Sequence, residues 1–261
     1  MIEFDKERIG TGTKEWADHV ENICLGCSNN CRYCYAAQNA ARFKRRDRDG
    51  WAREEITAKA SIVKYPSRAG VIMFPSAHDL TPGNFRECIQ FLRKVLEAGN
   101  SVLIVSKPNP CCMAELREAL SIYRENVLFR FTIGTTDAPA SLFWEPGAPL
   151  PKDRIAALYD AFKDGWRTSV SMEPLLGGVI TARSVIKAVE PFATDSIWIG
   201  KMNKIRTRVK IQKDVDREMV EFIESRQTDK EMLRLFLEFQ DNPKIFWKDS
   251  IREVVSRITN V

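Results

Sequence analysis

The chain has 261 residues, a length that suits a single domain of the barrel type. Hydrophobic residues make up 44% of it, enough for a core, and the formal net charge of +5 is only a weak indication of an anionic partner. No apolar run approaches the roughly 20 residues that span a bilayer, and the charged first ten residues do not resemble a signal peptide. We therefore expect a cytoplasmic protein with no membrane partner, whose seven cysteines are reduced.

The first segment with clear chemical content is a cysteine loop, GCSNNCRYCY, at residues 26–35. Cys27, Cys31 and Cys34 have the spacing Cys-x3-Cys-x2-Cys, and Tyr33 precedes the last of them. Three thiolates on one short loop can bind three irons of a [4Fe–4S] cluster. The fourth iron is then left for a ligand that is not protein, unlike the closed four-cysteine set of a ferredoxin.

Three other interpretations of this loop remain open. A zinc site could use the pairs Cys24-x2-Cys27 and Cys31-x2-Cys34, but only three residues separate the pairs, where zinc modules usually have about 12–20. A redox-active Cys31-x2-Cys34 pair would leave Cys24 and Cys27 without a role. A disulfide framework would leave one of the seven cysteines unpaired, and a chain with this much core does not need one.

Helical and strand patterns alternate beyond the loop. Helix formers predict a helix over residues 35–45. Short apolar runs predict buried strands at 70–75, 101–106, 127–133, 168–172 and 196–200. Apolar residues at helical spacing predict helices at 84–98, 112–123, 151–164 and 182–189. Helices dominate from 214 to 239, and residues 244–247 are a candidate for a last short strand before a closing helix.

This alternation predicts parallel strands joined by right-handed crossovers. About six strand–helix units can be counted if one strand precedes the cysteine loop. We therefore predict an α/β fold, a partial (β/α)6 barrel of the TIM type. The chain should form one domain, with a core over about residues 18–205 and a C-terminal helical extension over about 206–261. In such barrels the functional groups gather at the carboxyl ends of the strands.

The cysteine loop resembles the Cys-x3-Cys-x-aromatic-Cys signature of the radical S-adenosylmethionine (radical SAM) superfamily. Three strand-end segments and Arg154 resemble spore photoproduct lyase-like members: SAHDLTP (76–82), VSKPN (105–109) and FTIGTTDAPASLFWEPGAP (131–149). The N-terminal TGTKEWADHVENICLGC resembles radical SAM proteins of phages and mobile elements. The similarity covers about residues 20–205, and the C-terminal third departs from the lyase pattern.

The resemblance implies two cofactors, a [4Fe–4S] cluster on Cys27, Cys31 and Cys34 and S-adenosyl-L-methionine (SAM) on the open iron. An electron from a donor such as flavodoxin or ferredoxin would cleave SAM to methionine and a 5′-deoxyadenosyl radical. That radical would abstract hydrogen from a nucleic-acid base, with a thymine-derived base in DNA as the expected target. The reaction would be of lyase or isomerase type, either repair of a lesion or rearrangement of a modified phage thymine. The alternatives are a radical SAM enzyme acting on a small metabolite or peptide, and a non-catalytic nucleic-acid-binding protein with zinc or a cluster.

Two basic segments favour a nucleic-acid partner. Five basic residues fall within residues 42–48, and six fall within residues 201–213, which contain no acidic residue. Such segments can bind a phosphate backbone. The alternative for each is a solvated basic surface.

Residues at the predicted strand ends supply candidates for SAM binding. The family resemblance implies that Tyr33 packs near the adenine, and Lys107 is suited to pairing with the SAM carboxylate. Glu145 could anchor SAM or the segment that follows the fourth strand. Hydroxyl groups that could bond the SAM amine or ribose belong to Ser76, Thr135 and Ser171.

The remaining candidates concern the substrate. His78 and Asp79 could bind it or transfer a proton, and a chain with two histidines is not expected to have a multi-histidine metal site. Cys111 or Cys112 could donate a hydrogen atom to a product radical, with packing at a helix start as the alternative. Cys88 lies on the apolar face of a predicted helix and is expected in the core.

Overall fold

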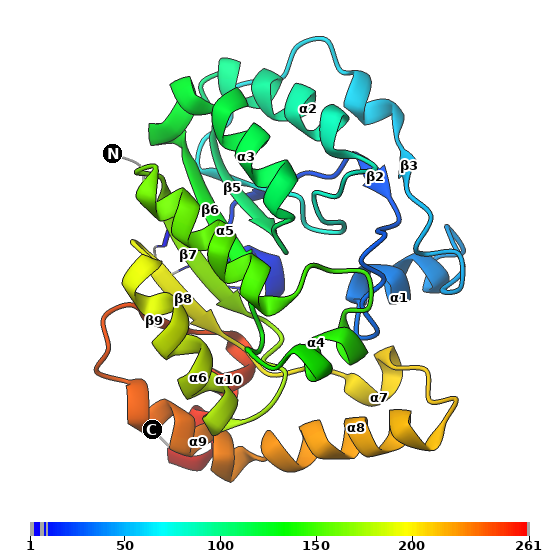
Figure 1. Ribbon diagram of the computed structural model, residues 1–261, viewed down its shortest axis with the longest axis vertical. Helices are drawn as coiled ribbons and strands as arrows, with labels where there is room; N and C mark the ends of the chain where they lie inside the picture. Colours follow the sequence, from blue (N-terminus) through cyan, green and yellow to red (C-terminus); the bar gives the residue numbers. More distant parts are fainter. Residues whose placement is uncertain (1–2, 6–7, 9, 260–261) are drawn as a thin grey trace.

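The computed structural model describes residues 3–5, 8 and 10–259, and its main feature is one parallel sheet that forms a half barrel (Figure 1). The strands follow one another across the sheet in the order β1-β4-β5-β6-β7-β8-β9, so each crossover moves the chain one strand further in the same direction. Their bounds are β1 His19–Val20, β4 Val71–Phe74, β5 Ser101–Ser106, β6 Val127–Thr132, β7 Arg167–Met172, β8 Ser196–Ile199 and β9 Ile245–Trp247. A separate antiparallel pair joins β2 Cys24–Leu25 to β3 Glu55–Ile56.

Helices α2, α3, α5 and α6 follow one another along the outer side of the strands (Figure 1). Helices α8 and α9 lie along the bottom of this view, near the C-terminus of the chain. The α-helices are α1 Tyr35–Arg42, α2 Phe85–Glu97, α3 Pro110–Ala119, α4 Ala138–Trp144, α5 Pro151–Lys163, α6 Val179–Val189, α7 Ile205–Arg208, α8 Asp214–Arg226, α9 Asp229–Phe239 and α10 Asp249–Thr259. None of the helices in the described part of the chain combines the length and apolar character needed to cross a bilayer.

Side-chain alternation along the strands builds two separate cores. One set of strand residues packs with apolar side chains of the helices: Ile72, Phe74, Val102, Ile104, Phe129, Phe131, Val170, Met172, Ile197 and Ile199. The other set faces the interior of the half barrel, together with Phe4 and Trp16 of the N-terminal segment: Val71, Met73, Leu103, Val105, Leu128 and Trp198.

Polar residues occupy part of the interior face. Arg130 of β6 is fully buried, donates a hydrogen bond to Ser169 at 2.9 Å and forms an ion pair with Asp5. Its guanidinium lies 4.8 Å from the ring centroid of Trp16 and 5.3 Å from that of Trp198. The N-terminal segment therefore fills the barrel interior and neutralises the one arginine placed there by β6.

The observed fold confirms the predicted partial barrel, and the candidate strand at 244–247 is present as a seventh strand beside the six that were counted. Each predicted strand is present within two residues of its expected bounds, and β9 pairs in parallel with β8 as the seventh strand. The helix predicted at 112–123 instead begins at Pro110, because the Asn109 side chain accepts from the N–H groups of Cys111 and Cys112. It ends at Ala119, and a 3-10 segment, Ser121–Asn126, follows. The predicted division into a core and an extension stays a prediction.

Candidate functional site

A cavity of about 670 Å³ lies at the carboxyl ends of the strands, where functional groups of such barrels gather. All three cysteines of the loop line it, and α10 and the 3-10 segment η1 (Gly12–Glu15) supply further wall. The strand-end residues on its wall are Ser76, His78, Asp79, Lys107, Glu173 and Lys201. The cavity therefore brings together the cysteine loop and most of the predicted site residues.

The cysteine loop is held by backbone hydrogen bonds and by one arginine. The N–H of Cys27 donates to the carbonyl of Trp51 at 2.9 Å. Arg48 donates to the carbonyl of Cys31 at 2.9 Å. Cys34 is the N-cap of α1, and its sulfur accepts from the N–H of Ala37 at 3.4 Å. These contacts fix the loop before any ligand binds.

The three thiols fit a [4Fe–4S] cluster by chemical type and by placement on one cavity, since thiolates are its usual ligands. In this structure the three sulfur atoms do not point toward one common centre, as cluster ligands would. Sγ of Cys27 lies 3.9 Å from Oδ2 of Asp79, and Sγ of Cys34 faces α1. Across the described residues, no three His, Cys, Asp or Glu side chains converge as metal ligands. Burial raises the pKa of Cys31 to about 12, so the thiols must turn and lose protons to bind iron.

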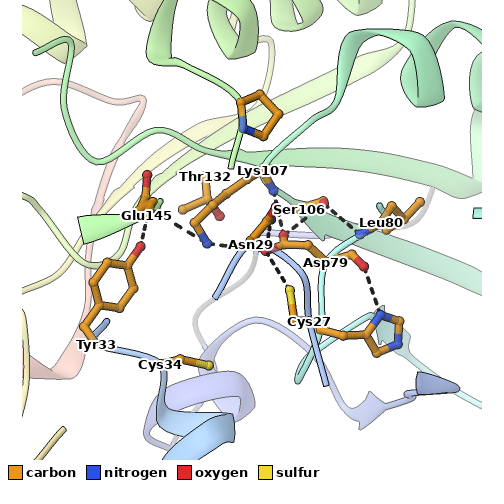
Figure 2. A network of polar contacts seen from close by, with 12 residues as sticks. Cys27, Asn29, Tyr33, Cys34, Asp79, Leu80, Ser106, Lys107, Thr132 and Glu145 are labelled. Atoms are coloured by element: carbon orange, nitrogen blue, oxygen red, sulfur yellow. Dashed lines mark hydrogen bonds and ion pairs between the residues drawn. The ribbon is translucent and has the colours of Figure 1, made fainter. Parts of the chain in front are cut away.

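Lys107 occupies the centre of the polar network beside the loop (Figure 2). Its Nζ lies 3.5 Å from Oδ2 of Asp79 and 3.9 Å from Oε1 of Glu145. Burial acts to raise the pKa of Asp79, but the Lys107 ammonium and hydrogen bonds from Asn29 and Ser106 outweigh it, and the pKa is lowered. The network thus holds a charged carboxylate and a cation next to the sulfur of Cys27.

Glu145 joins the loop to the barrel. It accepts a hydrogen bond from the hydroxyl of Tyr33 and pairs with Arg154 at 2.5 Å, and both members of this ion pair are only 1% exposed. Arg154 also donates to the carbonyls of Pro149 and Thr132, at 2.7 and 3.2 Å. The aromatic residue of the cysteine loop is therefore anchored through a carboxylate to a buried cation.

The three predicted hydroxyl residues are placed differently. Ser76 lines the cavity, and its Oγ accepts from the side chain of Asn22 at 2.8 Å. Oγ of Ser171 is buried and has no hydrogen-bond partner among the described residues. Thr135 does not line the cavity, and its hydroxyl accepts from the N–H of Asp137 at 3.0 Å in the turn after β6. Ser171, like Thr135, is absent from the cavity wall, so of the three only Ser76 lines it, and SAM binding by these hydroxyl groups stays a prediction.

His78 lines the cavity but has both ring nitrogens engaged with the backbone. The N–H of Ile23 donates to Nε2 at 3.3 Å, and Nδ1 lies 3.1 Å from the carbonyl oxygen of Asp79. Burial lowers the pKa of His78, which favours the neutral ring with its proton on Nδ1. The role of His78 in substrate binding or proton transfer stays a prediction.

The other cysteines lie away from the three of the loop. Cys24 lies on β2 and is absent from the cavity wall, and Cys88 is fully buried in the helix-side core, as expected. Cys112 is also part of that core, whereas Cys111 is exposed and lines a smaller cavity of about 380 Å³. Lys107 borders both cavities. Hydrogen donation by Cys111 or Cys112 stays a prediction, and neither lines the larger cavity.

Sequence reasoning missed a buried cluster of charges that the two ends of the chain build behind the cavity wall. Nζ of Lys248, after β9, lies 2.6 Å from Glu15 of η1 and 3.4 Å from Glu173, and of these three residues only Glu173 lines the cavity. No local pattern pairs residues so far apart in the chain. The one available signal was the short strand predicted at 244–247, since its carboxyl end must lie at the same edge as the others.

Residues on either side of the first basic segment contact the second one. Gln38 of α1 donates to the carbonyl of Thr207 in α7 at 3.1 Å, and Lys210 pairs with Asp49 at 3.4 Å. Two arginines of the first segment stabilise the cysteine loop. Arg46 donates to the carbonyl of Leu25, just before the loop, and Arg48 donates to the carbonyl of Cys31 within it. The exposed members of that segment are Arg42, Lys44 and Arg45, and the cavity wall includes Lys204 and Arg208 from the second.

No model of a known protein family matches the chain. An uncharacterized protein, ORF301 of the Acidianus two-tailed virus, is 26% identical over 182 residues, which are 65% of this chain and 60% of the viral protein. The match therefore spans less than two thirds of that relative.

Solved structures with similar folds include spore photoproduct lyase and SuiB. A mutant of the lyase with a dinucleoside spore photoproduct gives a TM-score of 0.56 at 11% identity, over 93% of this chain and 78% of the lyase. SuiB of Streptococcus suis, bound to the precursor peptide SuiA, gives 0.52 at 9% identity, over 90% of this chain and 49% of SuiB. Both proteins also have structures with bound SAM. This chain has their partial-barrel fold, the fold of radical SAM enzymes.

Proposed function

We propose that this protein is a radical SAM enzyme that acts on a nucleic-acid base. The observation that carries the proposal is the placement of Cys27, Cys31 and Cys34 on one cavity at the carboxyl ends of parallel strands. The same fold binds SAM in two other proteins. When bound, the cluster and SAM supply a reductive cleavage that yields a hydrogen-abstracting radical. Three cysteine ligands leave one iron open to SAM.

The residues around the loop suit SAM as a ligand. Nζ of Lys107 can pair with the SAM carboxylate, because it borders the cavity and forms only long ion pairs with Asp79 and Glu145. The side chain of Tyr33 lines the same cavity and is anchored by Glu145. Apolar walls formed by Trp51 and its neighbours would exclude water from a reactive radical.

A polyanionic substrate suits the charges at the cavity. Lys204 and Arg208 are part of its wall, and Arg42 and Arg45 are exposed on the adjoining segment. Phosphate contacts would position a strand, and a base would be turned out of its stack to reach the cavity. A thymine-derived base in DNA is the proposed target, in lesion repair or rearrangement. The support is the fold shared with the lyase that was solved with a dinucleoside spore photoproduct.

Incubation with DNA tests the substrate directly. The reconstituted protein with SAM and a reductant should convert a modified or lesion-bearing thymine, detected by mass spectrometry of the digested bases. Release of 5′-deoxyadenosine without any change in DNA or RNA would favour the second candidate, a peptide substrate, which the fold shared with peptide-bound SuiB supports.

Binding at several salt concentrations tests the basic surface. The double variant Arg42→Ala/Arg45→Ala should weaken binding of single-stranded DNA and reduce the salt slope by about 1.4, which is about 0.7 for each lost phosphate contact on a single strand. The charge-matched control is Lys152→Ala/Lys187→Ala, on the exposed sides of α5 and α6. Equal effects of the two double variants would reject a role of the basic segment in binding.

A further inference from the structure

Glu173 places a carboxyl group on the cavity wall, and neither cluster binding nor SAM binding requires it. It follows β7, lines the same cavity as the three loop cysteines, and keeps 24% of its side-chain surface exposed there. Within the described part of the chain, its one ion pair is with Lys248, at 3.4 Å from Oε2. The carboxyl group is therefore available to a ligand in the cavity.

Lys248, the cation next to Glu173, forms a shorter ion pair with another carboxylate, Glu15. Nζ of Lys248 lies 2.6 Å from Oε2 of Glu15 and donates to the carbonyl of Gly12 at 2.6 Å. It also lies 4.2 Å from the ring centroid of Trp16, and its side chain is fully buried. The shorter and better-enclosed contacts of Lys248 are thus with η1, and Glu173 has only the longer one.

The surroundings of Glu173 shift its titration toward the neutral form. Burial raises the pKa of Glu173; Lys248 lowers it, Glu15 and Asp249 raise it, and the balance is a raised pKa. The charged and titratable groups that face Glu173 come from several elements: Glu15 of η1, Lys248, Asp249 of α10, Arg208 of α7 and Tyr35 of α1. A carboxylic acid that its site keeps neutral can donate a hydrogen bond as well as accept one.

We propose that Glu173, as a neutral carboxylic acid, binds the imide edge of a thymine-type base in the cavity. This inference rests on the proposed function and specifies how the base would be recognised. A neutral carboxyl presents an O–H donor and a C=O acceptor side by side. The imide edge presents a C=O beside an N–H, so the two groups form a pair of hydrogen bonds. An ionised carboxylate offers only acceptors and would repel the base carbonyl.

The test is equilibrium binding of the thymidine dinucleotide TpT to the cofactor-free protein. Glu173→Gln keeps a donor and an acceptor in the same positions and should bind TpT like the unsubstituted protein at low pH. Glu173→Ala should bind about 10–100-fold more weakly, the loss expected for two hydrogen bonds in a buried site. TpT methylated at N3 of both bases lacks the imide N–H and should bind the unsubstituted protein as weakly as TpT binds Glu173→Ala.

The pH dependence separates a hydrogen-bonding role from a structural one. The affinity for TpT should be highest at pH values below the pKa of Glu173. It should fall as the pH rises through that pKa, because ionisation removes the O–H donor. Glu173→Gln should show no such weakening. The matched control is Glu97→Gln, an exposed carboxyl on α2 that does not line the cavity, and it should leave the affinity and its pH profile unchanged.

Three results would overturn the inference: Glu173→Gln as weak as Glu173→Ala, equal affinity for TpT and its methylated form, or no binding of TpT to any variant. Failure of the proposed function is recognised separately. It would appear as no binding of single-stranded DNA or RNA at low salt, or as no 5′-deoxyadenosine from the reconstituted protein. Bound DNA and 5′-deoxyadenosine together with an inert Glu173 would leave the proposed function standing and reject only this inference.

Discussion

Glu145→Gln should destabilise the protein measurably, because it removes one charge from a buried ion pair and keeps the side-chain volume. Glu145 and Arg154 are each 1% exposed and 2.5 Å apart. Breaking a buried pair leaves an unpaired charge and costs about 3–5 kcal/mol. Arg154 keeps its hydrogen bonds to the carbonyls of Pro149 and Thr132, so we expect the lower end, about 3 kcal/mol.

Thermal unfolding of the cofactor-free protein, followed by circular dichroism, measures this loss. A change of 1 kcal/mol shifts Tm by about 2–4 °C in domains of about this size, so Tm should fall by about 6–12 °C. Glu238→Gln is the control, because it removes the same charge from an exposed pair with Arg183, and its Tm should hardly change. Equal Tm values for the two variants would refute the claim that the pair anchors Tyr33 and the cysteine loop.

Three further substitutions probe the cysteine loop. Arg48→Ala removes the donor to the carbonyl of Cys31 and should cost about 1–2 kcal/mol and reduce the iron retained after reconstitution; unchanged iron content would contradict this. Gly147→Ala would place Cβ 2.2 Å from the carbonyl oxygen of Ser28, so it should displace the loop and lower Tm by more than a surface alanine does. Cys24→Ala should retain full iron content, since Cys24 does not line the cavity; loss of iron would contradict the assignment of Cys27, Cys31 and Cys34 as the complete ligand set.

The sequence was sufficient to predict the strands of the sheet. The apolar runs predicted as strands at 101–106 and 127–133 correspond to β5, Ser101–Ser106, and β6, Val127–Thr132, and both strands are buried along their whole length. The same positions fixed which side chains lie at the carboxyl ends, so Lys107 and Asp79 were expected near the loop. Both are there, 3.5 Å apart. Strands and helices can be predicted locally here because each contains its own repeat of apolar residues and its own capping residues.

Long-range contacts were beyond local reasoning. Glu15 and Lys248 form one buried ion pair although they lie near opposite ends of the chain, and neither has a sequence signature for burial. The interior pair of Arg130 and Asp5 is of the same kind. In each case the partner is decided by how the chain ends close the half barrel, which no window of neighbouring residues contains.

Hydrogen-bond partners of single polar residues also needed the structure. The sequence marked His78 as a polar residue at a strand end, and the structure surrounds its two nitrogens with backbone groups of Ile23 and Asp79. Thr135 was marked by the same rule and bonds its own turn. Position at a strand end predicts that a residue lies near the cavity. The geometry of the local turn decides whether its side chain faces the cavity or bonds to the backbone.

The three loop cysteines should support SAM cleavage, and a single assay of the reconstituted protein and its cysteine variants can show whether they do. The protein is reconstituted anaerobically with iron and sulfide, mixed with SAM and dithionite, and assayed for 5′-deoxyadenosine by mass spectrometry. We expect 5′-deoxyadenosine from the unsubstituted protein and none from Cys27→Ala, Cys31→Ala or Cys34→Ala. No 5′-deoxyadenosine from the iron-loaded protein, or equal amounts from any of the three variants, would contradict that expectation.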